Sequence, residues 1–126
     1  MVRLQEARKI IEAAEKKAAE IRQPMNIAVV DEGGNLVSHV RMDGASIGSI
    51  DIAINKALTA RAFDISTTEP ARRSQSGGHV FNHGCGMVFA GGVALKRDGK
   101  IVGAVGVSGG SGEQDQAVAE AGAKAF

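Results

Sequence analysis

The stretch MNIAVVDEGGNLVSHVRM, residues 25–42, contains two runs rich in β-branched and apolar residues on either side of the polar run DEGGN. Such runs favour β-strands, and Gly33 and Gly34 can adopt the positive φ angles of a tight turn. The stretch therefore predicts a β-hairpin. Its first strand, Ile27 to Val30, is apolar at successive positions, so both of its faces are expected to be covered. We therefore expect an α/β (α+β) domain, a three-layer α/β/α sandwich with helices on both faces of the sheet.

A helix is predicted before this hairpin, over residues 3–21. Apolar side chains recur there at steps of three and four, which places them on one face of a helix. Pro24 then ends the pattern. The expected buried positions are Leu4, Ala7, Ile11, Ala14, Ala18 and Ile21.

A second helix is predicted after the hairpin, beginning at a capping Ser46 or Ser49 and ending at about Arg61. The polar segment that follows, from residue 64 to 85, has no periodicity and is expected to be a long loop. The apolar stripe expected for this helix comprises Ile47, Ile50, Ile54, Ala57 and Arg61.

The C-terminal part predicts a second hairpin and a last helix. Asp98-Gly99 lies between two β-prone runs and is a strong signal for a tight turn. Ser111 and Gln114 fit a helix capping box, so a helix is expected to begin near Ser111. The strand glycines, residues 91, 92, 103 and 106, indicate bulges or close backbone approaches.

The composition limits the class of protein. The chain has 126 residues, of which 44% are hydrophobic, so we expect one domain over residues 1–126. It has no Trp or Tyr and a net charge of +1, which gives no support for nucleic-acid binding. No run of about 20 apolar residues predicts a membrane span. The charged start and the single cysteine favour a cytoplasmic protein without an intrachain disulfide.

The segment GGHVFNHGCG, residues 77–86, contains two of the three histidines and the single cysteine. Imidazole and thiolate are ligands for zinc and iron, so His79, His83 and Cys85 are candidate metal ligands. A histidine here can also ligate haem iron or act as an acid or base near neutral pH. The alternative is that both histidines are exposed loop residues and Cys85 is a small buried residue.

Two further positions are candidates for binding a ligand. On the second strand of the first hairpin, His39 and Arg41 alternate with Ser38 and Val40. The guanidinium group of Arg41 is suited to bind a carboxylate or propionate group of a ligand. The alternative is that Arg41 forms an ion pair with Asp43, Asp31 or Glu113. Lys56 either reaches solvent or directs its ammonium group at a pocket, Glu113 or Asp115. The ligand-binding candidates are therefore Arg41, Asp43, Lys56, His79, Phe81, His83 and Asp115.

The run GVSGGSGEQ, residues 106–114, has the outline of a phosphate-binding turn, because glycines lead into a helix N-terminus. It lacks the Gly-Lys-Ser/Thr signature, and Glu113 and Asp115 would repel an anion. We favour a tight strand-to-helix turn with its own caps.

Three segments together resemble the GlcG/HbpS-like family, which includes the C-terminal domain of PduO-type proteins. They are IAVVDEGGNLVSHVRMDGA (27–45), IAINKALTARAF (52–63) and AGGVALKRDGKIVGAVGVSGGSGEQDQAVAEAG (90–122). The resemblance implies a profilin-like fold with a five-stranded antiparallel sheet covered by helices. It also implies a homo-oligomer, as a dimer, tetramer or octamer, and an association with haem or corrinoid.

The leading hypothesis is a small oligomeric ligand-binding protein with a pocket near the 64–85 loop. By resemblance, its ligand is haem, another tetrapyrrole or a planar organic acid. The second hypothesis is an enzyme that uses His79 and His83, with Cys85 or a carboxylate such as Glu113, for acid/base or metal-assisted chemistry on a small metabolite. A structural or accessory protein without a ligand is the third.

Overall fold

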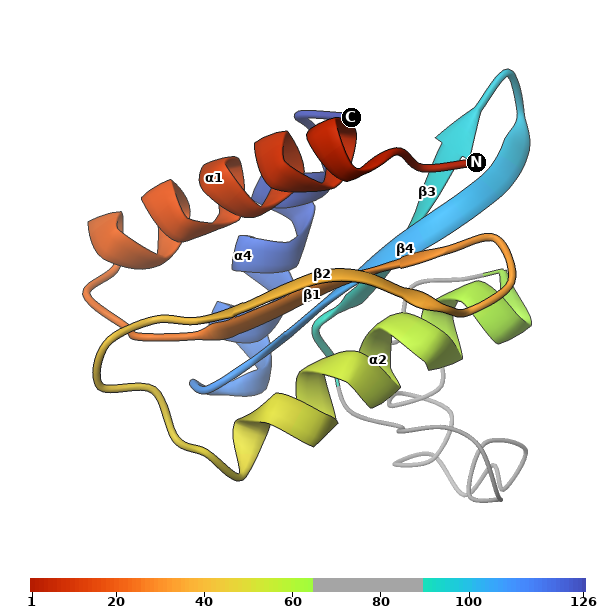
Figure 1. Cartoon of the computed structure of the whole chain (residues 1–126). Coiled ribbons are helices and arrows are strands. Elements are labelled where there is room, and N and C mark those ends of the chain that lie inside the picture. The colour runs from red at the N-terminus through yellow and green to blue at the C-terminus, as the bar shows by residue number, and fades with distance from the viewer. Residues whose placement is uncertain (65–89) are drawn as a thin grey trace.

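The computed structural model describes residues 1–64 and 90–126 (Figure 1). These residues form a mixed α+β domain with three helices and one antiparallel sheet. The elements in chain order are α1 (Leu4–Glu20), β1 (Asn26–Asp31), β2 (Leu36–Arg41), α2 (Ser49–Phe63), β3 (Gly92–Arg97), β4 (Lys100–Ser108) and α4 (Gly112–Ala123).

The sheet has the strand order β2-β1-β4-β3, and each neighbouring pair is antiparallel. Helices α1 and α4 pack together on one face, and α2 covers the other (Figure 1). The predicted three-layer arrangement is confirmed. The predicted number of strands is wrong for the described residues, which form four strands and not five. Gly103 and Gly106 lie within one strand of nine residues, Lys100–Ser108, and both are close to neighbouring backbone, as expected.

Both predicted hairpins form, and their turn residues show why. In the first, the carboxylate oxygen Oδ1 of Asp31 accepts hydrogen bonds from the backbone amides of Gly33 and Asn35, at 2.9 Å each. In the second, Asp98 and Gly99 have φ angles of 52° and 78°. Two successive positive φ angles are typical of the type I′ turn, whose twist matches that of the flanking strands.

The buried face of α1 is largely the predicted one. Ala7, Ile11, Ala14 and Ala18 are buried, together with Ile10, and they pack against the apolar side chains of β1 and β4. The two ends of the predicted stripe are not buried as expected, because Leu4 is 45% exposed and Ile21 is half-buried.

The predicted stripe of α2 is correct for Ala57, which is buried, but wrong for its isoleucines. Ile47 precedes the helix and is 76% exposed, and Ile50 and Ile54 are only half-buried. Gly48 is the N-cap and no side chain caps the helix, so the predicted serine cap is also absent. Besides Ala57, the residues that α2 buries are Ser49, Ala53, Lys56, Thr59 and Ala60.

Close contact with β4 explains this choice of face. A Cβ atom built on Gly106 would lie 2.5 Å from the backbone nitrogen of Ala57 and still closer to the carbonyl oxygen of Ala53. The backbone of α2 therefore lies directly on a strand position without a side chain. Only small residues fit at such a distance, so alanines face the sheet and the larger isoleucines turn outward.

Substituting Gly106 by Ala should destabilise the domain, because the added methyl group meets helix backbone that cannot move without displacing α2. We expect a loss of about 1–3 kcal/mol or more in the free energy of unfolding, measured by urea denaturation. Gly112→Ala is the matched control, since its Cβ would meet only the Ala90 side chain at 3.7 Å. Equal stability of the two variants would contradict the proposed close contact.

Candidate functional site

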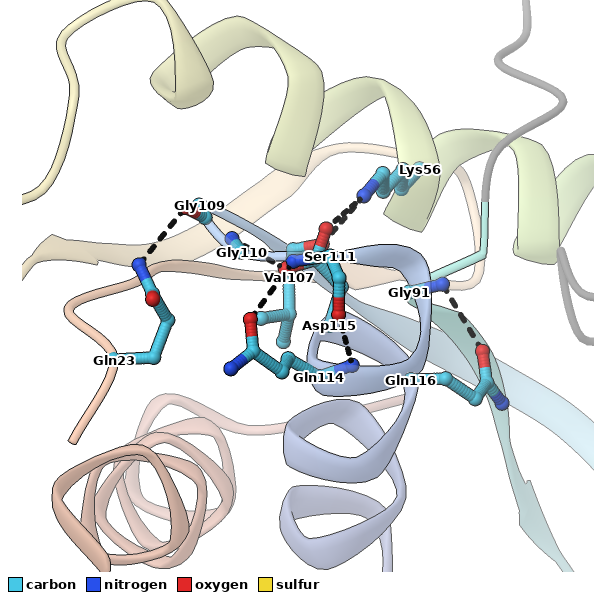
Figure 2. Close-up of polar contacts among 10 residues, drawn as sticks. All are labelled: Gln23, Lys56, Gly91, Val107, Gly109, Gly110, Ser111, Gln114, Asp115 and Gln116. Carbon is cyan, nitrogen blue, oxygen red and sulfur yellow. Dashed lines mark hydrogen bonds and ion pairs between the residues drawn. The ribbon is translucent and has the colours of Figure 1, made fainter. Parts of the chain in front are cut away.

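A buried ion pair joins the two helical layers at one end of the sheet (Figure 2). The Nζ atom of Lys56, on α2, lies 2.8 Å from Oδ2 of Asp115, on α4, although the residues are 59 positions apart. Their side chains are only 3% and 5% exposed. Lys56 also donates to the carbonyl oxygen of Val107 at 2.9 Å, and Oδ1 of Asp115 accepts from the Gly110 amide at 2.9 Å. The sequence prediction allowed this partner for Lys56, and the structure brings the two together.

Burial opposes the charge on both members of this pair. Desolvation raises the pKa of the Asp115 carboxyl, while the Lys56 ammonium and the backbone amides of Gly110 and Gly109 lower it. Desolvation also lowers the pKa of Lys56, against the effect of Asp115. Each charge is therefore stable mainly because the other is present.

The surroundings of the pair are closely packed. Gly91 has a φ of 122°, and a Cβ atom on it would lie 2.5 Å from the Val107 oxygen and 2.9 Å from Lys56 Nζ. The Gly91 amide donates to Oε1 of Gln116 at 3.0 Å, and its carbonyl accepts from the Val107 amide at 2.8 Å. The carboxylate oxygens and the ammonium group thus bind residues of the fold, and this geometry favours a structural role for the pair.

The glycine turn before α4 uses its donors internally (Figure 2). The amide of Ser111 donates to Oε1 of Gln114, and the amide of Gln114 donates to Oγ of Ser111, which is the predicted capping box. The Gly110 amide is bonded to Asp115. A phosphate would have to displace these bonds beside a carboxylate, so the geometry agrees with the interpretation as a capped turn.

A second polar cluster lies on β2, at the edge of the sheet. The Nε2 atom of His39 lies 2.9 Å from Oδ1 of Asn26, whose Nδ2 atom donates to the carbonyl oxygen of Ser46 at 2.9 Å. Arg41, two residues further along β2, donates from Nη1 to the carbonyl oxygen of Ala45 at 3.2 Å. Burial lowers the pKa of His39, and the charge of Arg41 lowers it further.

Asn26 is a polar residue of this cluster that was not among the candidates expected from the sequence. Its signal is an amide within the apolar run MNIAVV, at a position that is fully buried. For His39, the only signal in the sequence is its place in the alternating pattern of the second strand. Of the residues that the structure describes, Asp31, Asp43 and Glu113 form no ion pair with Arg41, so that expectation for its role is not met.

The remaining candidates divide into two groups. Asp43 and Glu113 are exposed, the first after β2 and the second in the first turn of α4. His79, Phe81, His83 and Cys85 lie outside the described residues, so their roles stay predictions of the sequence. Residues 1–64 and 90–126 contain no group of three or more His, Cys, Asp or Glu residues suited to a metal ion. No helix in these ranges is long and apolar enough to cross a membrane.

Comparison with known proteins identifies the family. The family described as "Haem degrading protein HbpS-like" matches residues 2–124. The chain belongs to the HbpS-like family. The resemblance seen in the sequence is therefore confirmed over nearly its whole length.

Relatives of known structure share the fold. The Klebsiella pneumoniae protein ORFY is 37% identical, with a TM-score of 0.92 over 99% of this chain and 90% of that one. The structure titled PduOC:Heme complex is 32% identical, with a TM-score of 0.91 over 99% and 94% of the two chains. Among relatives found by sequence, the corrinoid adenosyltransferase PduO of Citrobacter freundii is 38% identical over 92% of this chain. The matched region is only 36% of the length of that protein.

Removing the lysine of the buried pair should be more harmful at neutral than at acid pH. In Lys56→Met, Asp115 loses the ammonium group that lowers its carboxyl pKa. Burial already raises this pKa in the natural protein, so we expect it to rise further in the variant. A raised carboxyl pKa contributes stability that is present at low pH and is lost as the pH rises through the folded value. We expect a loss of about 3–5 kcal/mol at pH 7.5 and a smaller loss at pH 5, measured by urea unfolding.

The double variant Lys56→Met/Asp115→Asn is the control for this experiment, because it has no ionisable group at the site. Its loss of stability relative to the natural protein should change less between the two pH values than the loss of the single variant. A single variant whose loss does not change with pH would contradict an uncompensated Asp115.

Proposed function

We propose that this protein binds haem or a related tetrapyrrole. The observation that supports this most strongly is the similarity to the PduOC:Heme complex, which extends over 99% of this chain at 32% identity. The description of the matching family also names haem. A shared fold alone would not suggest a ligand, but here fold, sequence identity and coverage all agree.

We assign roles to residues as part of this proposal. His79 or His83 would ligate the iron, because imidazole is a common axial ligand of haem, with Cys85 as the thiolate alternative. Phe81 would supply apolar contact, since the chain has neither Trp nor Tyr. Arg41 is exposed on the edge strand and is suited to an acid group of the ligand.

The pocket would lie near the 64–85 loop, at an interface between subunits. A domain of this size has little interior volume beyond its core, which favours a ligand site shared between copies. A homo-oligomer, as a dimer, tetramer or octamer, is part of this proposal, as are a cytoplasmic location and Asp43 as a further ligand contact.

The test is a titration of the purified protein with haem, followed by its absorbance. We expect a saturable shift of the Soret band that is lost in the double variant His79→Ala/His83→Ala. Cobalamin is titrated in parallel, because PduO is named a corrinoid adenosyltransferase. Saturable binding of cobalamin without haem binding would replace haem by a corrinoid as the ligand, and the absence of both would refute the proposal.

A second candidate is an enzyme that degrades haem, which the family description favours. In this case His79, His83 or Glu113 would supply acid/base groups near the bound haem. Bleaching of the Soret band after addition of hydrogen peroxide, faster than for haem with an unrelated protein and slowed by Glu113→Gln, would support it. A stable Soret band would leave the protein as a binder.

A further inference from the structure

The tautomer of His39 is determined by its neighbours. The carbonyl oxygen of Ser46 can only accept a hydrogen bond, so the atom of Asn26 that faces it, at 2.9 Å, must be the amide nitrogen. The other end of the Asn26 side chain, Oδ1, therefore faces Nε2 of His39 and can only accept. It follows that Nε2 of His39 has a proton and that, in the neutral ring, Nδ1 presents a lone pair.

This arrangement uses a fully buried amide to orient a half-buried imidazole. Asn26 is 0% exposed and occupies a strand position between apolar residues. Burying an amide is unfavourable unless its polar atoms are bonded, and here both ends are. The amide therefore holds the ring of His39 at one end and the loop at Ser46 at the other. Hydrogen bonds of this kind orient functional histidines in many proteins.

The environment of His39 favours the neutral form of its ring. Burial and the charge of Arg41 both lower the pKa of His39. The lone pair on Nδ1 is therefore available at neutral pH, and the ring accepts a hydrogen bond at this atom instead of donating one.

Arg41 supplies a cation beside this acceptor. The two residues are separated by one position on β2, so their side chains leave the same face of the strand, with Cα atoms about 7 Å apart. The bond from Arg41 to the carbonyl oxygen of Ala45 holds the guanidinium near the loop after β2. Among the residues that the structure describes, no carboxylate pairs with it.

The position on the edge strand leaves these groups accessible. Helix α2 packs on β4, β1 and β3 but has little contact with β2. The residues of β1 up to Val30 are buried, whereas His39 is half-buried and Arg41 is exposed. A hydrogen-bond acceptor and a cation thus stand side by side on the least covered strand of this face.

We propose that His39 and Arg41 together bind a small carboxylic acid with a hydroxyl group on the adjacent carbon. The guanidinium fork of Arg41 binds the carboxylate, and the hydroxyl group donates its proton to Nδ1 of His39. An acid without this hydroxyl places no donor at Nδ1 and loses one hydrogen bond. This site involves Arg41, as the haem proposal does, but it does not depend on haem.

The experiment compares racemic lactate with propionate, which lacks only the hydroxyl group, by isothermal titration calorimetry without haem. We expect lactate to bind about fivefold more tightly, as one additional hydrogen bond would give. His39→Phe keeps a ring but removes the acceptor, so it should bind both acids as weakly as the natural protein binds propionate. Arg41→Gln should bind neither. Arg8→Gln, exposed on α1, is the matched control and should behave as the natural protein does.

A second measurement does not require a variant to fold. The ring nitrogens of His39 in the ¹⁵N-labelled natural protein should show a protonated Nε2, and lactate should shift the Nδ1 resonance while propionate should not. Equal affinities for the two acids, binding of neither, unchanged lactate binding by His39→Phe, or an unmoved Nδ1 resonance would each overturn the proposal. A failed haem titration would refute the proposed function and leave this result untouched.

Discussion

The buried pair of Lys56 and Asp115 is the constraint on which the arrangement of layers depends. It joins α2, on one face of the sheet, to α4, on the other, at 2.8 Å. A buried charge without its partner is strongly unfavourable. The positions of α2 and α4 are therefore stable only when both charged groups and their further hydrogen bonds are in place. The turn before α4, Gly91 just before β3 and Val107 near the end of β4 are arranged around this pair.

Small residues set the distances between the layers. Where α2 crosses β4, Gly106 and the alanines of the helix bring two backbones together, and the larger isoleucines are turned outward. The helix covers the inner strands closely and leaves β2 less covered. The same packing that builds a core without Trp or Tyr therefore also leaves His39 and Arg41 on an accessible edge.

Two kinds of buried polar group thus serve different purposes in one domain. Lys56 and Asp115 bind each other and the backbone, and their position is explained by folding. Asn26 binds a histidine that is half in solvent, and packing alone does not explain its position. Membership of the HbpS-like family, with a relative titled as a heme complex, directs attention to the 64–85 loop. The cluster on β2 is a separate place where the fold presents oriented chemical groups.

The sequence by itself determined the features that depend on neighbouring residues. These are the face of α1, the turns at DEGGN and Asp98-Gly99, the capping box at Ser111, and the covered strand that required three layers. Only the tertiary structure decided the buried face of α2, because that choice follows from a missing side chain on β4. It also selected Asp115 over Glu113 as the partner of Lys56, and it joined Asn26 to His39. Periodicity reports which side of an element is apolar, but not which distant backbone or polar atom that side will meet.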